Sequence, residues 1–280
     1  MNDISAATAG TVTLGDISVN RLGFGAMRIT GQGVWGEPED HDGAIAVLRR
    51  AVELGVNFID TADAYGPEVS ENLIREALHP YEGVTIATKG GLTRSGPDQW
   101  HPDGSPEHLR EAVEASLKRL DVESIDVYQF HRPDPNVPFE DSVAALVELQ
   151  KAGKIRHIGL SNVTVAQLEA ARDMTQIVSV QNRYNIGDAQ ESAPVLDFCT
   201  ANSIAFIPWF PVGGGADLSK LQTVADRHNA SPHQIALGWL LAKSPIMLPI
   251  PGTKSIEHLE ENIAAAAIKL TDEDLDELGR

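Results

Sequence analysis

The sequence predicts a (β/α)8 barrel that occupies residues 1–280 as one domain. Short apolar runs of strand length alternate with segments of helical periodicity, and from residue 22 onward this pair occurs eight times. Such alternation is typical of a parallel sheet covered by helices, and the chain has the length of a complete barrel. Polar residues also follow several of the apolar runs directly, where barrels of this kind carry their active sites.

The chain begins with a predicted hairpin, because alternating apolar residues flank Gly15 and Asp16 at 11–14 and 17–19. The eight barrel strands are expected at residues 22–27, 56–60, 84–88, 125–130, 155–160, 177–180, 204–208 and 246–250. The barrel helices are expected at 42–54, 70–78, 106–120, 141–150, 165–172, 193–201, 232–241 and 256–267. Gly55 supplies a stop for the first helix, and Ser70 resembles an N-cap for the second. Residues 271–278 open with Thr271 and three acids, which predicts an extra C-terminal helix outside the barrel.

Composition and charge limit the possible partners. The chain has 22 Lys and Arg against 40 Asp and Glu, a net charge of −18, so its field repels nucleic acids and anionic membranes. No apolar run reaches the length of a membrane span, and the first ten residues do not read as a signal peptide. We therefore expect a cytoplasmic protein. The single cysteine, Cys199, has apolar neighbours and is expected to be a buried thiol.

A glycine-rich stretch at residues 31–36 reads G-Q-G-V-W-G and matches the dinucleotide fingerprint G-x-G-x-x-G. That fingerprint requires its last glycine to open a helix, whereas here E-P-E-D follows. We therefore interpret it as a mobile loop at the mouth of the site. Trp35 in this loop is then available to line the substrate pocket.

The candidate catalytic residues lie at the ends of neighbouring strands. Asp60 ends the second strand, Lys89 the third and His131 the fourth, while Tyr65 lies on the turn just beyond Asp60. The following strands end at Ser161-Asn162, Gln181-Asn182 and Trp209. Because a barrel directs its strand ends toward one mouth, all of these residues are expected to meet there.

Three chemistries could use this set of side chains. A metal site formed by Asp60, Asp63 and His131 lacks an H-x-H pair, and Lys89 would compete with the ion. A Schiff base at Lys89 requires a desolvated neutral amine, whereas Asp60 would keep it charged. The third arrangement fits better: Asp60 holds Lys89, the ammonium lowers the pKa of Tyr65, and His131 binds a substrate carbonyl oxygen. No metal is expected.

Several motifs together resemble the aldo-keto reductase family over nearly the whole chain. They are G-F-G-A-M at 23–27, N-F-I-D-T-A-D-A-Y-G at 57–66, T-K-G-G at 88–91, Y-Q-F-H-R-P-D-P at 128–135, I-R-H-I-G-L-S-N at 155–162, Q-N-R-Y-N at 181–185 and I-P-G-T-K-S with E-E-N between 250 and 262. The resemblance implies that Asp60, Tyr65, Lys89 and His131 form the family's catalytic tetrad, which is intact here.

The resemblance also implies NADPH bound without a Rossmann fold, with NADH as a possible second cofactor. Ser161, Asn162 and Gln181 suit the nicotinamide carboxamide, and Trp209 suits stacking on its ring. The other implied contacts are Gly25 and Met27 near the first strand, Val212 and Gly213 at the pyrophosphate, Thr253, Lys254 and His258 at the 2′-phosphate, and Glu261 and Asn262 at the adenine. His258 stands where many relatives carry arginine, so this pocket has fewer fixed cations than the strongest NADP binders.

The implied activity is reduction of a small aldehyde or ketone, with hydride from the nicotinamide and a proton from Tyr65. Trp35 and Arg132 are the candidate substrate contacts. The 31–36 loop and P-V-G-G-G at 211–215 resemble a bacterial branch that includes pyridoxal reductases, so pyridoxal is one candidate substrate. The alternative is a cofactor-sensing binding module with little turnover, as in the related potassium-channel beta subunits.

Overall fold

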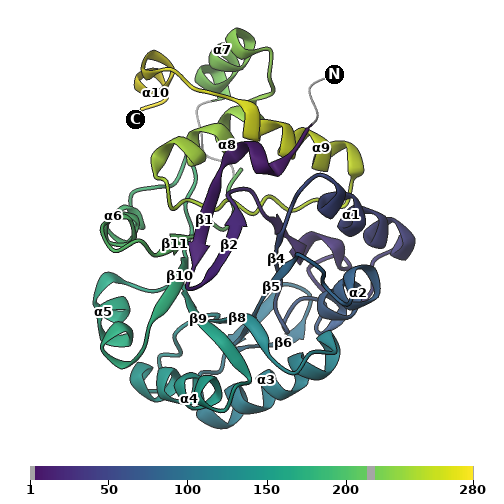
Figure 1. Ribbon diagram of the computed structural model, residues 1–280, viewed down its shortest axis with the longest axis vertical. Coiled ribbons are helices and arrows are strands. Elements are labelled where there is room, and N and C mark those ends of the chain that lie inside the picture. Colours follow the sequence, from purple (N-terminus) through teal and green to yellow (C-terminus); the bar gives the residue numbers. More distant parts are fainter. Residues whose placement is uncertain (1–3, 213–217, 280) are drawn as a thin grey trace.

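A parallel sheet of seven strands lies at the centre of the computed structural model, which describes residues 4–212 and 218–279. The helices surround these strands as an outer ring (Figure 1). In spatial order the strands are β11 (Ala205–Phe206), β10 (Ile177–Gln181), β9 (Ile155–Ser161), β8 (Ile125–Phe130), β5 (Thr85–Gly90), β4 (Phe58–Asp60) and β3 (Phe24–Gly25). This order follows the sequence, as a barrel requires.

The eighth strand position of the barrel is occupied by an extended segment at residues 246–250 rather than by a regular strand. Phe206 of β11 donates its N–H to the carbonyl of Ile246 at 2.9 Å and accepts from the N–H of Leu248 at 2.8 Å. On the other side, Gly23 donates to the carbonyl of Pro249 at 2.9 Å. Pro249 has no N–H to give, so the regular ladder is interrupted here. The segment nevertheless closes the ring, and the predicted (β/α)8 barrel is confirmed.

Two glycines allow β3 and the extended segment at 246–250 to approach closely at the mouth of the barrel. A Cβ on Gly25 would lie 2.7 Å from the carbonyl oxygen of Ile250, and one on Gly252 would lie 2.3 Å from the carbonyl oxygen of Gly25. Side chains at either position would force the backbones apart. The glycines of G-F-G and I-P-G therefore have a packing role at the edge of the site.

The predicted barrel helices are all present, with ends shifted by a few residues. They are α1 (His41–Glu53), α2 (Val69–Leu78), α3 (Pro106–Leu120), α4 (Phe139–Lys151), α5 (Val165–Met174), α6 (Ala193–Ala201), α8 (Pro232–Lys243) and α9 (Ile256–Ala264), and short 3-10 turns lie at η1 (Ala6–Ala9), η2 (Ala26–Ile29) and η3 (Ala265–Ala267). Their apolar faces pack against the outside of the strands, and Cys199 is buried there as predicted. Burial raises the pKa of this thiol to about 12. Within the described ranges, each helix is too short or too polar to span a bilayer.

The predicted N-terminal hairpin closes one end of the barrel. It consists of β1 (Thr11–Leu14) and β2 (Ile17–Asn20) and lies across the ring of strands in Figure 1. Val12, Leu14 and Val19 are buried against inward-facing barrel residues, among them Phe58 and Leu248. Because this plug fills the amino ends of the strands, only the carboxyl ends remain for a site.

The predicted C-terminal helix is also confirmed, as α10 (Asp272–Glu277). Thr271 caps it, and Asp274 completes a capping box by accepting from the Thr271 backbone. In Figure 1 this helix lies outside the barrel, near α7 (Leu218–His228). The helix α7 was not predicted, although its buried Leu221 and Val224 lie at helical spacing.

Two predictions about the start of the barrel were wrong in detail. The first strand was expected at 22–27, but β3 has only two residues and the chain turns into η2 immediately afterwards. Ser70 was expected to cap α2; instead Glu68 stands at that position with φ of 69° and no side-chain cap, and Ser70 is buried inside the helix. The Ser70 hydroxyl is used elsewhere, as a partner of Thr61 at 2.8 Å.

An unpredicted hairpin stands between β5 and α3, made of β6 (Leu92–Gly96) and β7 (Gln99–Pro102). It touches the 31–36 loop, since Asp98 donates its N–H to the carbonyl of Gly33 at 3.0 Å. That loop is also held by the turn after β4, because Gly36 donates its N–H to the carbonyl of Gly66 at 2.6 Å. No helix opens at Gly36, in agreement with the rejection of the dinucleotide fingerprint.

Candidate active site

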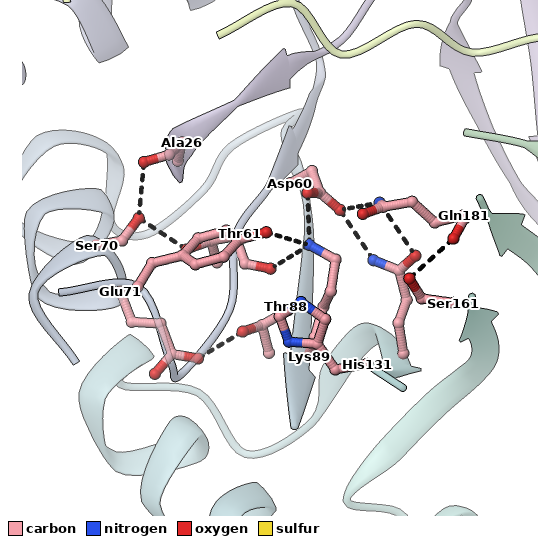
Figure 2. A network of polar contacts seen from close by, with 12 residues as sticks. Ala26, Asp60, Thr61, Ser70, Glu71, Thr88, Lys89, His131, Ser161 and Gln181 are labelled. Carbon is pink, nitrogen blue, oxygen red and sulfur yellow. Dashed lines mark hydrogen bonds and ion pairs between the residues drawn. The ribbon is translucent and has the colours of Figure 1, made fainter. Parts of the chain in front are cut away.

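The centre of the site is the ammonium group of Lys89, at the carboxyl end of β5. Its Nζ lies 2.6 Å from Oδ1 of Asp60, 2.8 Å from the carbonyl oxygen of Thr61 and 3.3 Å from the hydroxyl of Tyr65. Lys89 is fully buried, and Asp60 and Tyr65 are buried beside it. A buried lysine normally needs a partner charge, and Asp60 provides it. Figure 2 shows the Lys89 side chain directed between Asp60 and Thr61.

Two glutamine side chains hold the other oxygen of the Asp60 carboxylate. Gln129 of β8 donates to Oδ2 at 2.9 Å and Gln181 of β10 donates to it at 2.8 Å. The carboxylate is therefore fixed from three strands at once. Because both oxygens are occupied, Asp60 is oriented toward Lys89 and does not turn to a substrate.

Thr61 is held in turn by a chain of hydroxyl contacts. Its Oγ1 donates to the hydroxyl of Ser70, which donates to the carbonyl of Ala26 at 3.3 Å. On the opposite side of β5, Thr88 donates to the buried carboxylate of Glu71 at 2.6 Å, as Figure 2 shows. These contacts brace the strand ends that carry the central residues.

His131 completes the set from the end of β8. Its ring lies 5.9 Å from the Tyr65 ring, centroid to centroid, at an interplanar angle of 81°. Its backbone N–H donates to the carbonyl of Gly90 at 2.9 Å, which ties it to the strand beside Lys89. The ring is buried, and its Nδ1 has no partner among the described residues. The His131 ring therefore lies beside the Tyr65 ring at the centre of the site.

The charges of these groups follow from burial and from Lys89. Burial alone would lower the pKa of Lys89, but the Asp60 carboxylate raises it above its ordinary value. Burial lowers the pKa of His131 well below 6.5, and the charge of Lys89 lowers it further. The histidine is therefore neutral at pH 7 and offers one N–H donor.

The expected lowering of the Tyr65 pKa was wrong for the protein alone. Lys89 does act in that direction, but burial of the phenol is the larger effect and raises the pKa above 10. The physical reason is that the Lys89 charge is shared with Asp60, while the phenolate would lose nearly all of its hydration. Tyr65 is therefore protonated at neutral pH.

The polar residues at the ends of β9 and β10 are close to this centre but already bonded to each other. Asn162, with φ of 59°, donates to the carbonyl of His131 and to the hydroxyl of Ser161, both at 3.0 Å. Its side-chain oxygen accepts from the indole N–H of Trp209 at 3.0 Å. The side-chain amide of Gln181 donates to Asp60 and Gln129, whereas its side-chain oxygen accepts no hydrogen bond from the described residues. The set therefore offers acceptors rather than donors to a bound group.

Asn182 was expected at the mouth but turns away from it, because both ends of its amide bond the backbone of Val163. Trp209 is half-buried, with the guanidinium of Arg183 located 5.6 Å from its ring centroid. Val212 is also half-buried. Gly213 lies outside the described residues. Met27 is exposed, at 39% of its full accessibility, whereas Gly25 is buried.

The residues after the extended segment at 246–250 lead into the N-terminus of α9. Ser255 caps that helix by accepting from the N–H of His258, while Lys254 and His258 are exposed and Thr253 is buried. Free N–H groups at a helix start and a nearby cation are typical of a phosphate site. Glu261 differs from this picture, since its carboxylate already accepts from the hydroxyl of Ser231. Asn262, the next residue, is half-buried.

The candidate substrate contacts stand at the rim. Trp35 is 37% exposed, and Arg132 is exposed next to His131. Sequence reasoning missed Trp100 of β7, whose ring lies 6.3 Å from that of Tyr65 and 6.5 Å from that of His131. The missed signal was the G-P-D turn at 96–98 between two short runs, which is typical of a hairpin.

The metal alternative combined Asp60 and His131 with Asp63. The backbone of Asp63 contacts that of Lys89, because the Asp63 N–H donates to the Lys89 carbonyl at 3.1 Å. Burial raises the pKa of the Asp63 carboxyl well above 3.8, which disfavours the charged form that binds a metal ion. Among the residues that the structure describes, no group of three or more His, Cys, Asp or Glu side chains is arranged to hold a metal ion.

Comparison with known proteins gives a consistent result. The model of the aldo/keto reductase family matches residues 21–280. The chain is 52% identical over 284 residues to an uncharacterized oxidoreductase of Schizosaccharomyces pombe, with 99% of this chain and 92% of that protein covered. It is 46% identical over 280 residues to pyridoxine 4-dehydrogenase of Escherichia coli, with 97% and 98% covered.

A solved structure of an aldo-keto reductase from Klebsiella pneumoniae in complex with NADPH has the same fold. The TM-score is 0.81 at 25% sequence identity, and the match covers 96% of this chain and 93% of that one. The family resemblance read from the sequence motifs is thereby confirmed.

Proposed function

Because the chain belongs to the aldo/keto reductase family, we propose that it reduces an aldehyde or ketone to the alcohol with NADPH, and that Tyr65 donates the proton. Family membership makes the chain an oxidoreductase. The observation that carries the finer proposal is the buried contact between the Tyr65 hydroxyl and the Lys89 ammonium, with neutral His131 beside it. A binding module without turnover would not need this arrangement.

Each residue has a distinct task in the proposed reaction. Bound NADPH would supply the hydride that reduces the carbonyl carbon. His131 donates a hydrogen bond to the carbonyl oxygen and orients it toward Tyr65. As negative charge develops on that oxygen, Tyr65 transfers its hydroxyl proton to it, and the ammonium of Lys89 stabilises the phenolate that remains. Asp60 keeps Lys89 charged and in place.

The residues around the mouth fit a nicotinamide nucleotide. The free oxygen of Gln181 and the remaining lone pair of Asn162 suit the amino group of a carboxamide, and Trp209 presents an aromatic ring. The relative crystallised with NADPH supports this cofactor. Lys254 and the N-terminus of α9 would hold the adenosine 2′-phosphate, with Gly25, Met27, His258, Glu261 and Asn262 as further proposed contacts.

Replacement of Lys254 by alanine tests the cofactor preference. We expect the dissociation constant for NADPH to rise at least about tenfold, because a charge-assisted contact to phosphate is lost. The constant for NADH, which lacks the 2′-phosphate, should change little. Fluorescence titration of both cofactors measures the effect, and Lys151→Ala on α4 is the control. Equal weakening of both cofactors would place the 2′-phosphate elsewhere.

The pH profile of reduction tests the proposed protonation states. Reduction requires protonated Tyr65 and neutral His131; the Tyr65 pKa is raised above 10 and the His131 pKa is lowered below 6.5. We therefore expect kcat/KM to be flat from about pH 6.5 to about pH 10 and to fall only outside this range. Initial rates in constant-ionic-strength buffers provide the measurement. A decline centred near pH 8 would contradict a Tyr65 proton donor with raised pKa.

Pyridoxal is the first substrate to test, since pyridoxine 4-dehydrogenase is among the similar proteins. NADPH oxidation should be followed with pyridoxal, sugar-derived aldehydes, methylglyoxal and aromatic aldehydes in parallel. Turnover of any of these supports carbonyl reduction, and pyridoxal is expected to have the highest kcat/KM. If none is reduced while NADPH binds, the protein is a cofactor-binding module and the proposed reaction is wrong.

A further inference from the structure

The guanidinium of Arg94 on β6 is bonded entirely within the protein. A guanidinium has five N–H donors, and each of these has an acceptor here. The acceptors are all backbone carbonyl oxygens, those of Gln99 (3.0 Å from Nε), Val34 and Ala64 (2.8 and 2.9 Å from Nη1), and Gly33 and Gly96 (2.9 and 3.2 Å from Nη2). No donor is left for a substrate or cofactor anion, so the contribution of Arg94 is to geometry.

These five carbonyls belong to three separate segments around the mouth. Gly33 and Val34 lie in the glycine loop at 31–36, Gly96 and Gln99 lie in the β6–β7 hairpin, and Ala64 lies in the turn between β4 and α2. Ala64 directly precedes Tyr65 in the chain. Arg94 thus fixes the peptide unit that carries the proposed proton donor, and it does so from outside the group formed by Asp60 and Lys89.

The same guanidinium covers one face of the Trp100 ring. Its central carbon lies 3.6 Å from the indole centroid, a close cation–π stack, and 5.7 Å from the ring of Trp35. Trp100 meets the Tyr65 ring at 86° and the His131 ring at 66°, while those two rings meet each other at 81°. The planes of the three rings are therefore steeply inclined to one another, and the indole of Trp100 is the most solvent-exposed of the three.

We propose that Arg94 is a positioning residue that holds Tyr65 and Trp100 in their working geometry, and that Trp100 selects planar aromatic carbonyl compounds over aliphatic ones. This inference rests on the proposed function, because it concerns the substrate of the same site. A flat ring attached to a carbonyl group held by Tyr65 and His131 can pack against the indole. An aliphatic chain gains less from such a wall, since it has no π face.

The first test replaces Arg94 by lysine, which keeps the charge but cannot reach five carbonyls from one nitrogen. We expect kcat for 4-nitrobenzaldehyde to fall at least about tenfold, because a small displacement of Tyr65 slows proton transfer. The dissociation constant for NADPH should stay within about twofold of wild type, since no cofactor contact is removed. The control is Arg110→Lys, an exposed arginine paired with Glu148 on the outside of the barrel, which should change neither value.

The second test is Trp100→Leu, which keeps an apolar side chain and removes the aromatic wall. The ratio of kcat/KM for 4-nitrobenzaldehyde to that for butanal should fall at least about fivefold, because an aromatic contact beyond simple burial is lost. This ratio is internal to one protein sample, so partial unfolding lowers both rates and leaves it unchanged. It therefore decides the specificity role of Trp100 even if Arg94→Lys proves too unstable to purify.

The outcomes separate this inference from the proposed function. If the wild type reduces neither aldehyde with NADPH, the proposed function fails. If the wild type reduces both but Trp100→Leu keeps the same ratio, the specificity role of Trp100 is wrong. If Arg94→Lys keeps wild-type kcat, or loses kcat and NADPH affinity to the same degree, Arg94 is a structural residue and not a positioning one.

Discussion

Tyr65→Phe is expected to reduce turnover by about 10²- to 10⁴-fold, because it removes the hydroxyl that donates the proton and contacts Lys89. The phenyl ring fills the same buried space between Lys89 and His131, so the fold and the NADPH dissociation constant should stay close to wild type. The measurement is the single-turnover rate of NADPH oxidation at saturating aldehyde, together with fluorescence titration of NADPH.

The matched control for this change is Tyr81→Phe. Tyr81 donates its hydroxyl proton to the carbonyl of Leu120 at 2.7 Å, away from the tetrad. This variant loses one tyrosine hydroxyl as well, and it should cost about 1 kcal/mol of unfolding free energy with unchanged turnover. If Tyr65→Phe turned over at the wild-type rate, Tyr65 would have no role in proton transfer.

Lys89→Met is expected to abolish activity and also to destabilise the protein by about 3–5 kcal/mol, because it leaves the Asp60 carboxylate buried without its cation. Asp60 would keep only the amide donors of Gln129 and Gln181. The free energy of unfolding, from urea denaturation, and the rate of NADPH oxidation should both be measured.

The double variant Asp60→Asn with Lys89→Met separates the two effects. It removes the unpaired charge, so most of the lost stability should return, while activity stays absent because no cation stabilises the Tyr65 phenolate. Return of activity in the double variant would show that Lys89 serves only to neutralise Asp60. Unchanged stability in the single variant would show that the pair contributes nothing to folding.

The positions of Asp60, Lys89 and His131 were predictable because each is tied to a strand end, and Tyr65 lies on the turn that follows one of them. Lys89 and His131 follow long apolar strands, and a parallel barrel brings such ends together whatever the loops do. Asp60 and its partner Lys89 were predicted as a pair for the same reason. The direction of the Tyr65 pKa was not predictable, because it depends on how completely the fold excludes water from the phenol.

The parts that sequence reasoning missed belong to insertions and to irregular backbone. Arg94 and Trp100 lie on a hairpin inserted into the loop after β5. The strand–helix alternation does not indicate this hairpin, and its local signal is the short G-P-D turn at 96–98. The extended segment at 246–250 departs from a regular strand at Pro249. The start of α2 was misplaced because the Ser70 hydroxyl bonds to Thr61. In each case a tertiary contact overrides a local preference.

The most direct test of the account follows a deuterium label from NADPH to product. Wild-type protein should be incubated with an aldehyde and NADPH deuterated at the transferable position of the nicotinamide, and the alcohol analysed by NMR. We expect one deuterium on the carbinol carbon in wild type and almost no labelled alcohol with Tyr65→Phe over the same time. Oxidation of NADPH without deuterium on that carbon would contradict carbonyl reduction at this site.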